Sequence, residues 1–263
     1  MSALWQMLAY VFRTVTIRHV IWIGTYTAYF ILMLLAPLLT NAYVYMVVGR
    51  MAYNFTNNAK IFGVKAWRMA LAFIICDIVA FIIQAAGASM ASGEDVPMHQ
   101  VKTGLHVYMG GIGLQELVIL MFFTLSLKFR QQMLRDLPAN ARKGPMTLIH
   151  VVFAVLALIS IRIIFRLIEY ANGIESSIVR HEAYQYIFDS TVMLIALVLF
   201  NVVHPGRIMP GTESDFPSRK QRKAAGKDAK WGRASQQEDS ALPGNQASYN
   251  LGQTYGGPKQ AEV

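Results

Sequence analysis

Five apolar stretches, each long enough to cross a lipid bilayer, constrain what this chain can fold into. They are Val20 to Val48, Met69 to Ala91, Gly104 to Leu127, Thr147 to Tyr170 and Ala183 to His204. A hydrocarbon core about 30 Å thick requires roughly 20 residues of helix, because each residue rises about 1.5 Å. Within that core the backbone must hydrogen-bond inside its own segment. The sequence therefore predicts an all-α bundle with five complete transmembrane helices.

The segments around these stretches complete the predicted organisation. Residues 1–18 are mostly apolar but too short to span a bilayer alone, so we expect a partial helix, either the end of a longer one or an interfacial segment. The transmembrane bundle is expected over residues 19–206, with a tilt or kink at Pro37. Residues 207–263 are rich in Gly, Ser, Gln and Lys without apolar periodicity, which predicts a disordered basic tail.

The charges between the stretches predict the orientation in the membrane. Basic residues are concentrated in two loops and the tail, at Arg50, Lys60, Lys65, Arg68, Lys128, Arg130, Arg135, Arg142, Lys143, Arg219, Lys220, Arg222, Lys223, Lys227, Lys230 and Arg233. The other two loops contain only Lys102 and Arg180 as Lys or Arg. Because positively charged loops stay on the cytoplasmic side, we expect a cytoplasmic C-terminus. The basic run of the tail either only sets this topology or also holds anionic lipids of the inner leaflet.

Ionisable and amide side chains occur inside the apolar stretches, where they are costly and must face the bundle interior. Three pairs of them are seven residues apart, and seven residues make nearly two helical turns, so each pair shares one face. The predicted substrate-binding residues are Asp77, Gln84, Gln115, Glu116, Arg162, Arg166, Glu169, Glu182 and Asp189.

Helix rise predicts which of these side chains meet. Arg162 lies about 12 Å and Asp189 about 9 Å below the same membrane surface, on consecutive antiparallel helices. We therefore predict an ion pair between Arg162 and Asp189. Arg166 is expected to pair with Glu169 or with Glu182.

Two interpretations fit these polar residues. They can hold the bundle together without a role in transport, or they can form a polar cleft for a lipid headgroup or a sphingoid amine. In the second interpretation Asp189, Glu182 and Asp77 are the best contacts for a cation, although Asp77 is expected to lie too deep to join the arginine pairs.

Small residues in the second and third stretches are expected to let helices approach closely. They are Gly87, Ala88, Gly110, Gly111 and Gly113.

Motifs of catalytic sites are missing from the sequence. It has no G-x-S-x-G elbow, no phosphate-binding glycine loop with lysine and no H-E-x-x-H zinc helix. We therefore expect that the protein is not an enzyme and holds no cofactor or resident metal. The alternative is an intramembrane metal hydrolase in which His99, His106, His181 and Asp189 bind the metal. The net charge of +9 comes from loops and a tail beside membrane helices, so nucleic acid is not an expected partner.

Four separate stretches carry an ordered set of motif residues. The first three hold Ala36-Pro37, Ala42, Tyr45 and Gly49-Arg50, then Asp77, Gln84 and Gly87, then Gly113-Leu114-Gln115. The fourth holds Arg162, Arg166, Glu169-Tyr170, Gly173, Glu182, Tyr186, Phe188-Asp189 and His204-Pro205-Gly206. Over roughly residues 6 to 206 this set resembles the fungal RTA-like family, also called lipid-translocating exporters.

That family is built on seven membrane helices with an outer N-terminus. Ala9-Tyr10 and Arg13 resemble the end of its second helix, with Gln6 where the family usually has Glu, so relative to the family the chain is expected to be truncated at its N-terminus. The resemblance implies a plasma-membrane protein that exports sphingoid bases or toxic amphiphiles and contributes to stress resistance. The alternative that it leaves open is a seven-helix receptor-like sensor that binds an amphiphile and signals through its basic inner loops and tail.

Overall fold

Helices account for all five apolar stretches in the computed structural model, which describes residues 2–18, 23–56, 60–61, 64–92, 97–171 and 182–209. In chain order the elements are α1 (Ser2–Arg18), α2 (Ile23–Phe55), β1 (Lys60–Ile61), β2 (Val64–Lys65), α3 (Ala66–Ala91), α4 (Met98–Asp136), η1 (Ala139–Ala141), α5 (Lys143–Ala171), α7 (Glu182–Gln185), η2 (Tyr186–Thr191), α8 (Val192–Val202) and α9 (Pro205–Ile208).

Five segments are long and apolar enough to cross a membrane. They are Ile31–Phe55, Ala66–Ala91, Met98–Asp136, Lys143–Ala171 and Ala183–Ile208. Large apolar side chains such as Ile82, Leu120 and Ile164 remain exposed on the outside of the bundle, which indicates contact with lipid rather than water. The predicted five-span membrane bundle is confirmed.

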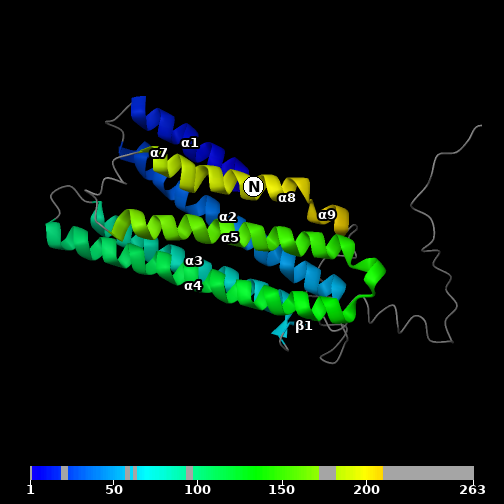
Figure 1. Cartoon of the computed structure of the whole chain (residues 1–263). Coiled ribbons are helices and arrows are strands. Elements are labelled where there is room, and N and C mark those ends of the chain that lie inside the picture. Colours follow the sequence, from blue (N-terminus) through cyan, green and yellow to red (C-terminus); the bar gives the residue numbers. More distant parts are fainter. Residues whose placement is uncertain are drawn as a thin grey trace, which may run out of the picture.

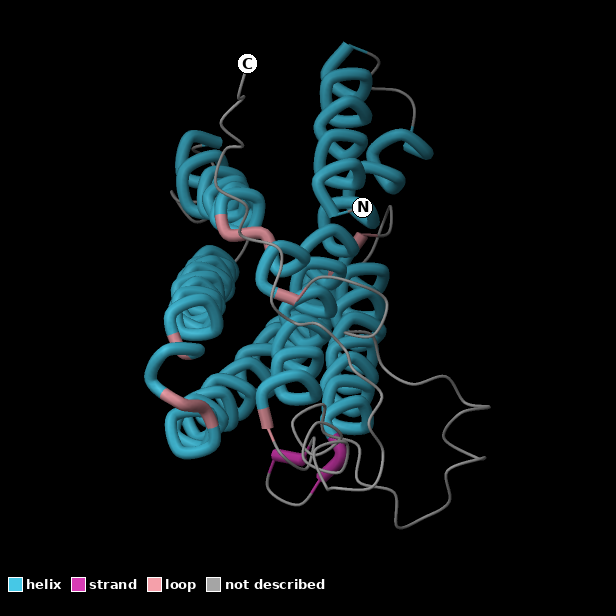
Figure 2. The backbone as a smooth tube through the Cα atoms, turned by 90° about the vertical axis from the view of Figure 1, so that its right-hand side faces the viewer, coloured by secondary structure: helices cyan, strands magenta, loops and turns pink. Residues whose placement is uncertain are grey.

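Helices that follow one another in the chain pack against one another, from α1 on α2 through to α5 on α8. Figure 1 shows α1 extending from near the middle of the bundle to the end where α7 lies. Figure 2 shows the two short strands outside the helical bundle. They pair antiparallel, Lys60 with Lys65, and reverse the chain between α2 and α3.

The N-terminal helix is confirmed, and it lies along α2 as a bundle helix does. The hydroxyl of Ser2 lies 3.0 Å from the carbonyl oxygen of Ala36, to which it donates a hydrogen bond. α2 continues as one helix through Pro37, so the kink there stays a prediction. At the other end, the predicted boundary at residue 206 falls inside α9, and the predicted tail beyond Met209 lies outside the described residues.

Two helices differ from the spans expected from hydropathy. α4 extends beyond the predicted span Gly104 to Leu127 at both ends, because polar helix-forming residues continue its hydrogen-bonding pattern after the apolar stretch stops. The last span is not one regular α-helix, since the π-helical turn η2 lies between α7 and α8. Hydropathy detects the spanning part of a helix but neither its ends nor a change of helix type within it.

Glycines bring α3 and α4 together at backbone distance. A Cβ added at Gly87 would lie 2.4 Å from the backbone nitrogen of Tyr108, and one at Gly111 would lie 2.9 Å from the backbone nitrogen of Gln84. The packing role predicted for these two glycines is confirmed. For Gly110 and Gly113 it was wrong, because a Cβ at either position would meet no atom within 4 Å: both point away from α3.

Gly87→Ala and Gly110→Ala form a matched pair of substitutions, the first in this interface and the second outside it. We expect Gly87→Ala to lower the free energy of unfolding by about 1–3 kcal/mol, because backbone cannot move aside for the new methyl group. Gly110→Ala is expected to be neutral or to stabilise by up to about 1 kcal/mol through helix propensity. Thermal unfolding in detergent measures both. Equal effects of the two substitutions would contradict the close approach of α3 and α4.

Candidate functional site

Four charged side chains from α5 and the last span form a charge cluster, defined by Arg162, Arg166, Glu169 and Asp189. The guanidinium of Arg162 donates from Nε to Oδ1 of Asp189, and that of Arg166 donates from Nη2 to Oδ2 at 2.6 Å. Arg166 also lies 3.3 Å from Glu169, between Nη1 and Oε2. All four residues are buried, and Asp189 is 1% exposed. Two positive and two negative charges therefore cancel inside the bundle, which is the arrangement that hydrocarbon requires.

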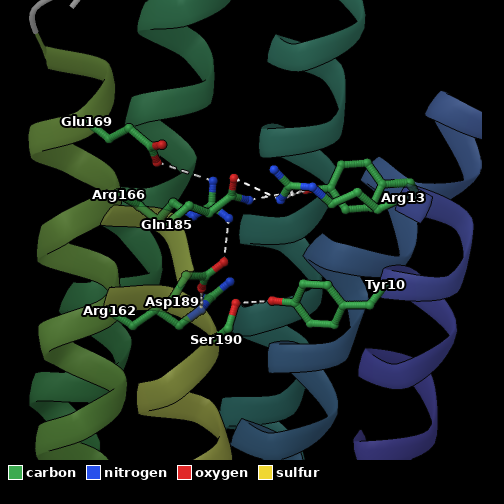
Figure 3. Close-up of polar contacts among 9 residues, drawn as sticks. Tyr10, Arg13, Arg162, Arg166, Glu169, Gln185, Asp189 and Ser190 are labelled. Atoms are coloured by element: carbon green, nitrogen blue, oxygen red, sulfur yellow. Dashed lines mark hydrogen bonds and ion pairs between the residues drawn. The ribbon is translucent and has the colours of Figure 1, made fainter. Parts of the chain in front are cut away.

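The helical context explains this geometry. Arg162 and Arg166 are four residues apart on α5, so they extend from the same face. Asp189 lies in η2, where the wider turn of a π-helix changes the direction of its side chain relative to the flanking α-helices. Its carboxylate lies between the two arginines, with one oxygen for each (Figure 3).

α1 contacts the last span next to the charge cluster. The hydroxyl of Tyr10 hydrogen-bonds with the hydroxyl of Ser190. Arg13 donates to Oε1 of Gln185 at 3.0 Å and lies 4.9 Å from the centroid of the Tyr186 ring. Figure 3 shows Tyr10 reaching from α1 toward Ser190, and Arg13 toward Gln185. The helix is thereby attached to the segment that carries Asp189.

The predicted pairing of Arg162 with Asp189 is confirmed, as is that of Arg166 with Glu169. The second bond of Arg166, to Asp189, was not predicted. The side chain of Glu182 lies outside the described residues, although α7 begins at this residue.

Asp77 lies apart from the charge cluster, as expected from its depth. Its Oδ2 atom accepts a hydrogen bond from Nδ2 of Asn41 at 3.1 Å and another from the hydroxyl of Tyr45 at 2.9 Å. Both donors belong to α2. Asn41 was not predicted, and the only signal for it in the sequence is its position four residues before Tyr45, on the same helix face.

Gln84 and Gln115 form the third polar site, which is uncharged and lies between α3 and α4. Nε2 of Gln84 donates to Oε1 of Gln115 at 2.9 Å, and both side chains are buried. The predicted polar residues are therefore divided among separate places instead of lining one continuous cleft. The charge cluster and the glutamine pair satisfy their charges and amides locally, as buried polar groups require.

Glu116 has a different environment from the other predicted residues. It lies near the middle of α4 and lines an open groove between α4 and α5, together with Gly113, Leu117, Leu120, Met121, Thr124 and Leu167. Leu117, Leu120 and Met121 are exposed on the outside of the bundle, so the groove faces lipid. Ser160 of α5 hydrogen-bonds the carboxyl group of Glu116. The Oε2 atom of Glu116 has no hydrogen-bond partner among the described residues.

A bundle of membrane-crossing helices with polar sites between them defines a polytopic integral membrane protein. A family profile described as "RTA1 like protein" matches residues 1–212. The chain belongs to this family, and the resemblance seen in the sequence is confirmed.

Three relatives illustrate the range of similarity. The chain is 37% identical over 235 residues to the probable lipid transporter atnI of Emericella nidulans, which covers 84% of this chain and 61% of that protein. It is 32% identical over 143 residues to the lipid-translocating exporter-like protein RTA1 of Leptosphaeria maculans, covering 49% of this chain and 27% of that protein. It is 24% identical over 249 residues to the sphingoid long-chain base transporter RSB1 of Saccharomyces cerevisiae, covering 81% of this chain and 64% of that protein. The chain thus spans less than two thirds of each of these relatives, and no solved structure matches it.

Substitutions in the charge cluster should show coupled effects on stability. Asp189→Ala leaves two buried arginines without their shared carboxylate, so we expect a loss of about 3–5 kcal/mol. Arg162→Ala should cost less, because Arg166 still contacts Asp189. The double variant should be clearly more stable than the sum of the two losses implies. Chemical unfolding of the four proteins in detergent measures the cycle, and strictly additive losses would contradict the pair.

Proposed function

We propose that this protein moves amine-bearing amphiphiles, such as sphingoid bases, between the leaflets of a membrane. The observation that carries the proposal is the lipid-facing groove at Glu116. A translocator must shield a polar headgroup at mid-membrane depth while the hydrocarbon tails stay in lipid. An open groove with apolar walls and one carboxyl group provides these two environments side by side.

The balance of charges favours Glu116 as the residue that contacts the headgroup. The carboxylates of the charge cluster already face two guanidinium groups, so an incoming amine would find no net negative charge there. Glu116 forms no ion pair within the described residues. A protonated amine in the groove would supply the missing positive charge, and each partner would reduce the desolvation cost of the other.

The names of the relatives support the same class of substrate. Two are named for lipid transport or translocation and one for transport of sphingoid long-chain bases. In our proposal the basic loops and the tail face the cytoplasm, the protein resides in the plasma membrane, and the tail contacts anionic lipids of the inner leaflet. The charge cluster then joins the last span to α5, which forms one side of the groove through Leu167.

Reconstitution into liposomes tests the proposed function. A fluorescent sphingoid base or a fluorescent phosphatidylcholine is placed in the outer leaflet, and its loss from that leaflet is followed with an external quencher. We expect the full chain to speed movement of the sphingoid base above protein-free vesicles. Glu116→Gln should slow it by about tenfold, which corresponds to about 1.4 kcal/mol of lost headgroup interaction. Movement of the phosphatidylcholine should change less, because its headgroup carries its own phosphate.

Ile82→Val is the matched control, since Ile82 is exposed on α3 and lies outside the groove. It should move both probes at the wild-type rate. Absence of movement by the wild-type chain would contradict a translocator and favour a receptor-like sensor. Equal slowing of both probes in Glu116→Gln would contradict recognition of the amine.

A further inference from the structure

Asp77 is a buried carboxyl group with an uneven set of hydrogen bonds. It lies about 17 Å along α3 from the start of that helix and is 1% exposed. Both of its donors, Asn41 and Tyr45, bond the same oxygen, Oδ2. Its other oxygen, Oδ1, is buried and has no hydrogen-bond partner in the described part of the chain, and the same is true of Oδ1 of Asn41. Two unpartnered acceptors beside one carboxyl group are what a bound proton would satisfy.

The groups around Asp77 offer no compensating charge. From α2 it faces Asn41 and the titratable Tyr45, and no Lys, Arg or His of the described residues forms an ion pair with it. On α3 the adjacent titratable residue, Cys76, is exposed on the outside. From α4 the ring of Phe122 packs on Tyr45, with centroids 4.5 Å apart. An ionised carboxylate in such a place would have two hydrogen bonds on one oxygen and no counter-charge to offset its burial, so it takes up a proton instead.

We propose that Asp77 is a proton-binding site that couples the bundle to the proton gradient. In the resting state the carboxyl group is neutral, with its proton on Oδ1. Both donors to Oδ2 come from α2, so separation of α2 from α3 would remove these bonds and admit water. The carboxyl group would then release its proton to that water and become a carboxylate, and it would take up a proton again when the helices close. The coupling part of this inference rests on the proposed function, whereas the protonated state does not.

Infrared spectroscopy of the full-length protein in detergent tests the protonated state. At neutral pH the wild type should show a carbonyl-stretch band of a protonated carboxylic acid that disappears on alkaline titration. Asp77→Asn should remove this band, and Glu116→Gln should leave it in place. A spectrum in which Asp77→Asn removes no such band at neutral pH would overturn the proposal.

Stability separates this role from a merely structural one. Asn at position 77 keeps an oxygen for both donors and adds an amide that can donate to Oδ1 of Asn41. Asp77→Asn should therefore unfold within a few degrees of the wild type, whereas Asp189→Asn, which removes the carboxylate shared by two arginines, should unfold at a much lower temperature. A loss in Asp77→Asn as large as that in Asp189→Asn would indicate an ionised carboxylate and overturn the proposal.

Coupling is tested in the same liposomes by imposing a pH difference across the membrane. The readout is the rate of sphingoid-base movement with the pH difference divided by the rate without it. This ratio should exceed one for the wild type and fall to one for Asp77→Asn. If the infrared band is present but the wild type moves no lipid, the proton site stands and the proposed function fails. If both proteins respond equally to the pH difference, the coupling role fails. The infrared band is also followed at fixed pH while sodium chloride or, as the control, choline chloride is added. Loss of the band with sodium chloride alone would mean that Asp77 binds a sodium ion, and it would overturn the proton site.

Discussion

The carboxylate of Asp189, shared by two arginines, is the interaction on which one half of this bundle depends, the half where α1, α5 and the last span meet. In hydrocarbon neither guanidinium could remain without a counter-charge, and the carboxylate could not remain without them. One residue therefore joins the last span to α5 through both of its oxygens. The neighbouring residues Gln185 and Ser190 extend this attachment to α1. Asp189 makes these contacts from within the π-helical turn η2.

The polar residues of the membrane region fall into two groups that differ in charge balance. The charge cluster is neutral as a whole, and the amide pair of Gln84 and Gln115 carries no charge. Asp77 and Glu116 are the carboxyl groups that no cation of the described residues neutralises. In the first group each charge or amide has a partner inside the bundle, so the group needs no ligand and specifies how helices meet. The second group is costly to bury unless a cation or a proton binds to it. For that reason we assign the amine of the ligand to Glu116 and the proton to Asp77.

Sequence reasoning was most successful where a single physical rule applies. Span length against bilayer thickness identified the five membrane helices, and helix rise placed Arg162 opposite Asp189. It failed where the outcome depends on how two helices face each other. Gly110 and Gly111 are adjacent in the sequence, yet only Gly111 faces α3. The second bond of Arg166 goes to a residue of the π-helical turn, for which the apolar pattern of the last span contains no signal. Asn41 was missed because one amide in an apolar stretch has no partner until α2 and α3 are placed together.

The helix boundaries of this bundle differ in the kind of contact that holds them. α3 and α4 meet at backbone distance through Gly87 and Gly111, which leaves no room for one to slide on the other. α5 and the last span are held by the ion pairs of Asp189. α2 meets α3 through two hydrogen bonds to one oxygen of Asp77 and through the ring of Tyr45 on that of Phe73, with centroids 5.6 Å apart. α4 meets α5 through aromatic contacts such as Phe123 on Phe153. The uncompensated carboxyl groups, Asp77 and Glu116, lie at these two boundaries, where helix contacts alone leave a buried acid without a counter-charge.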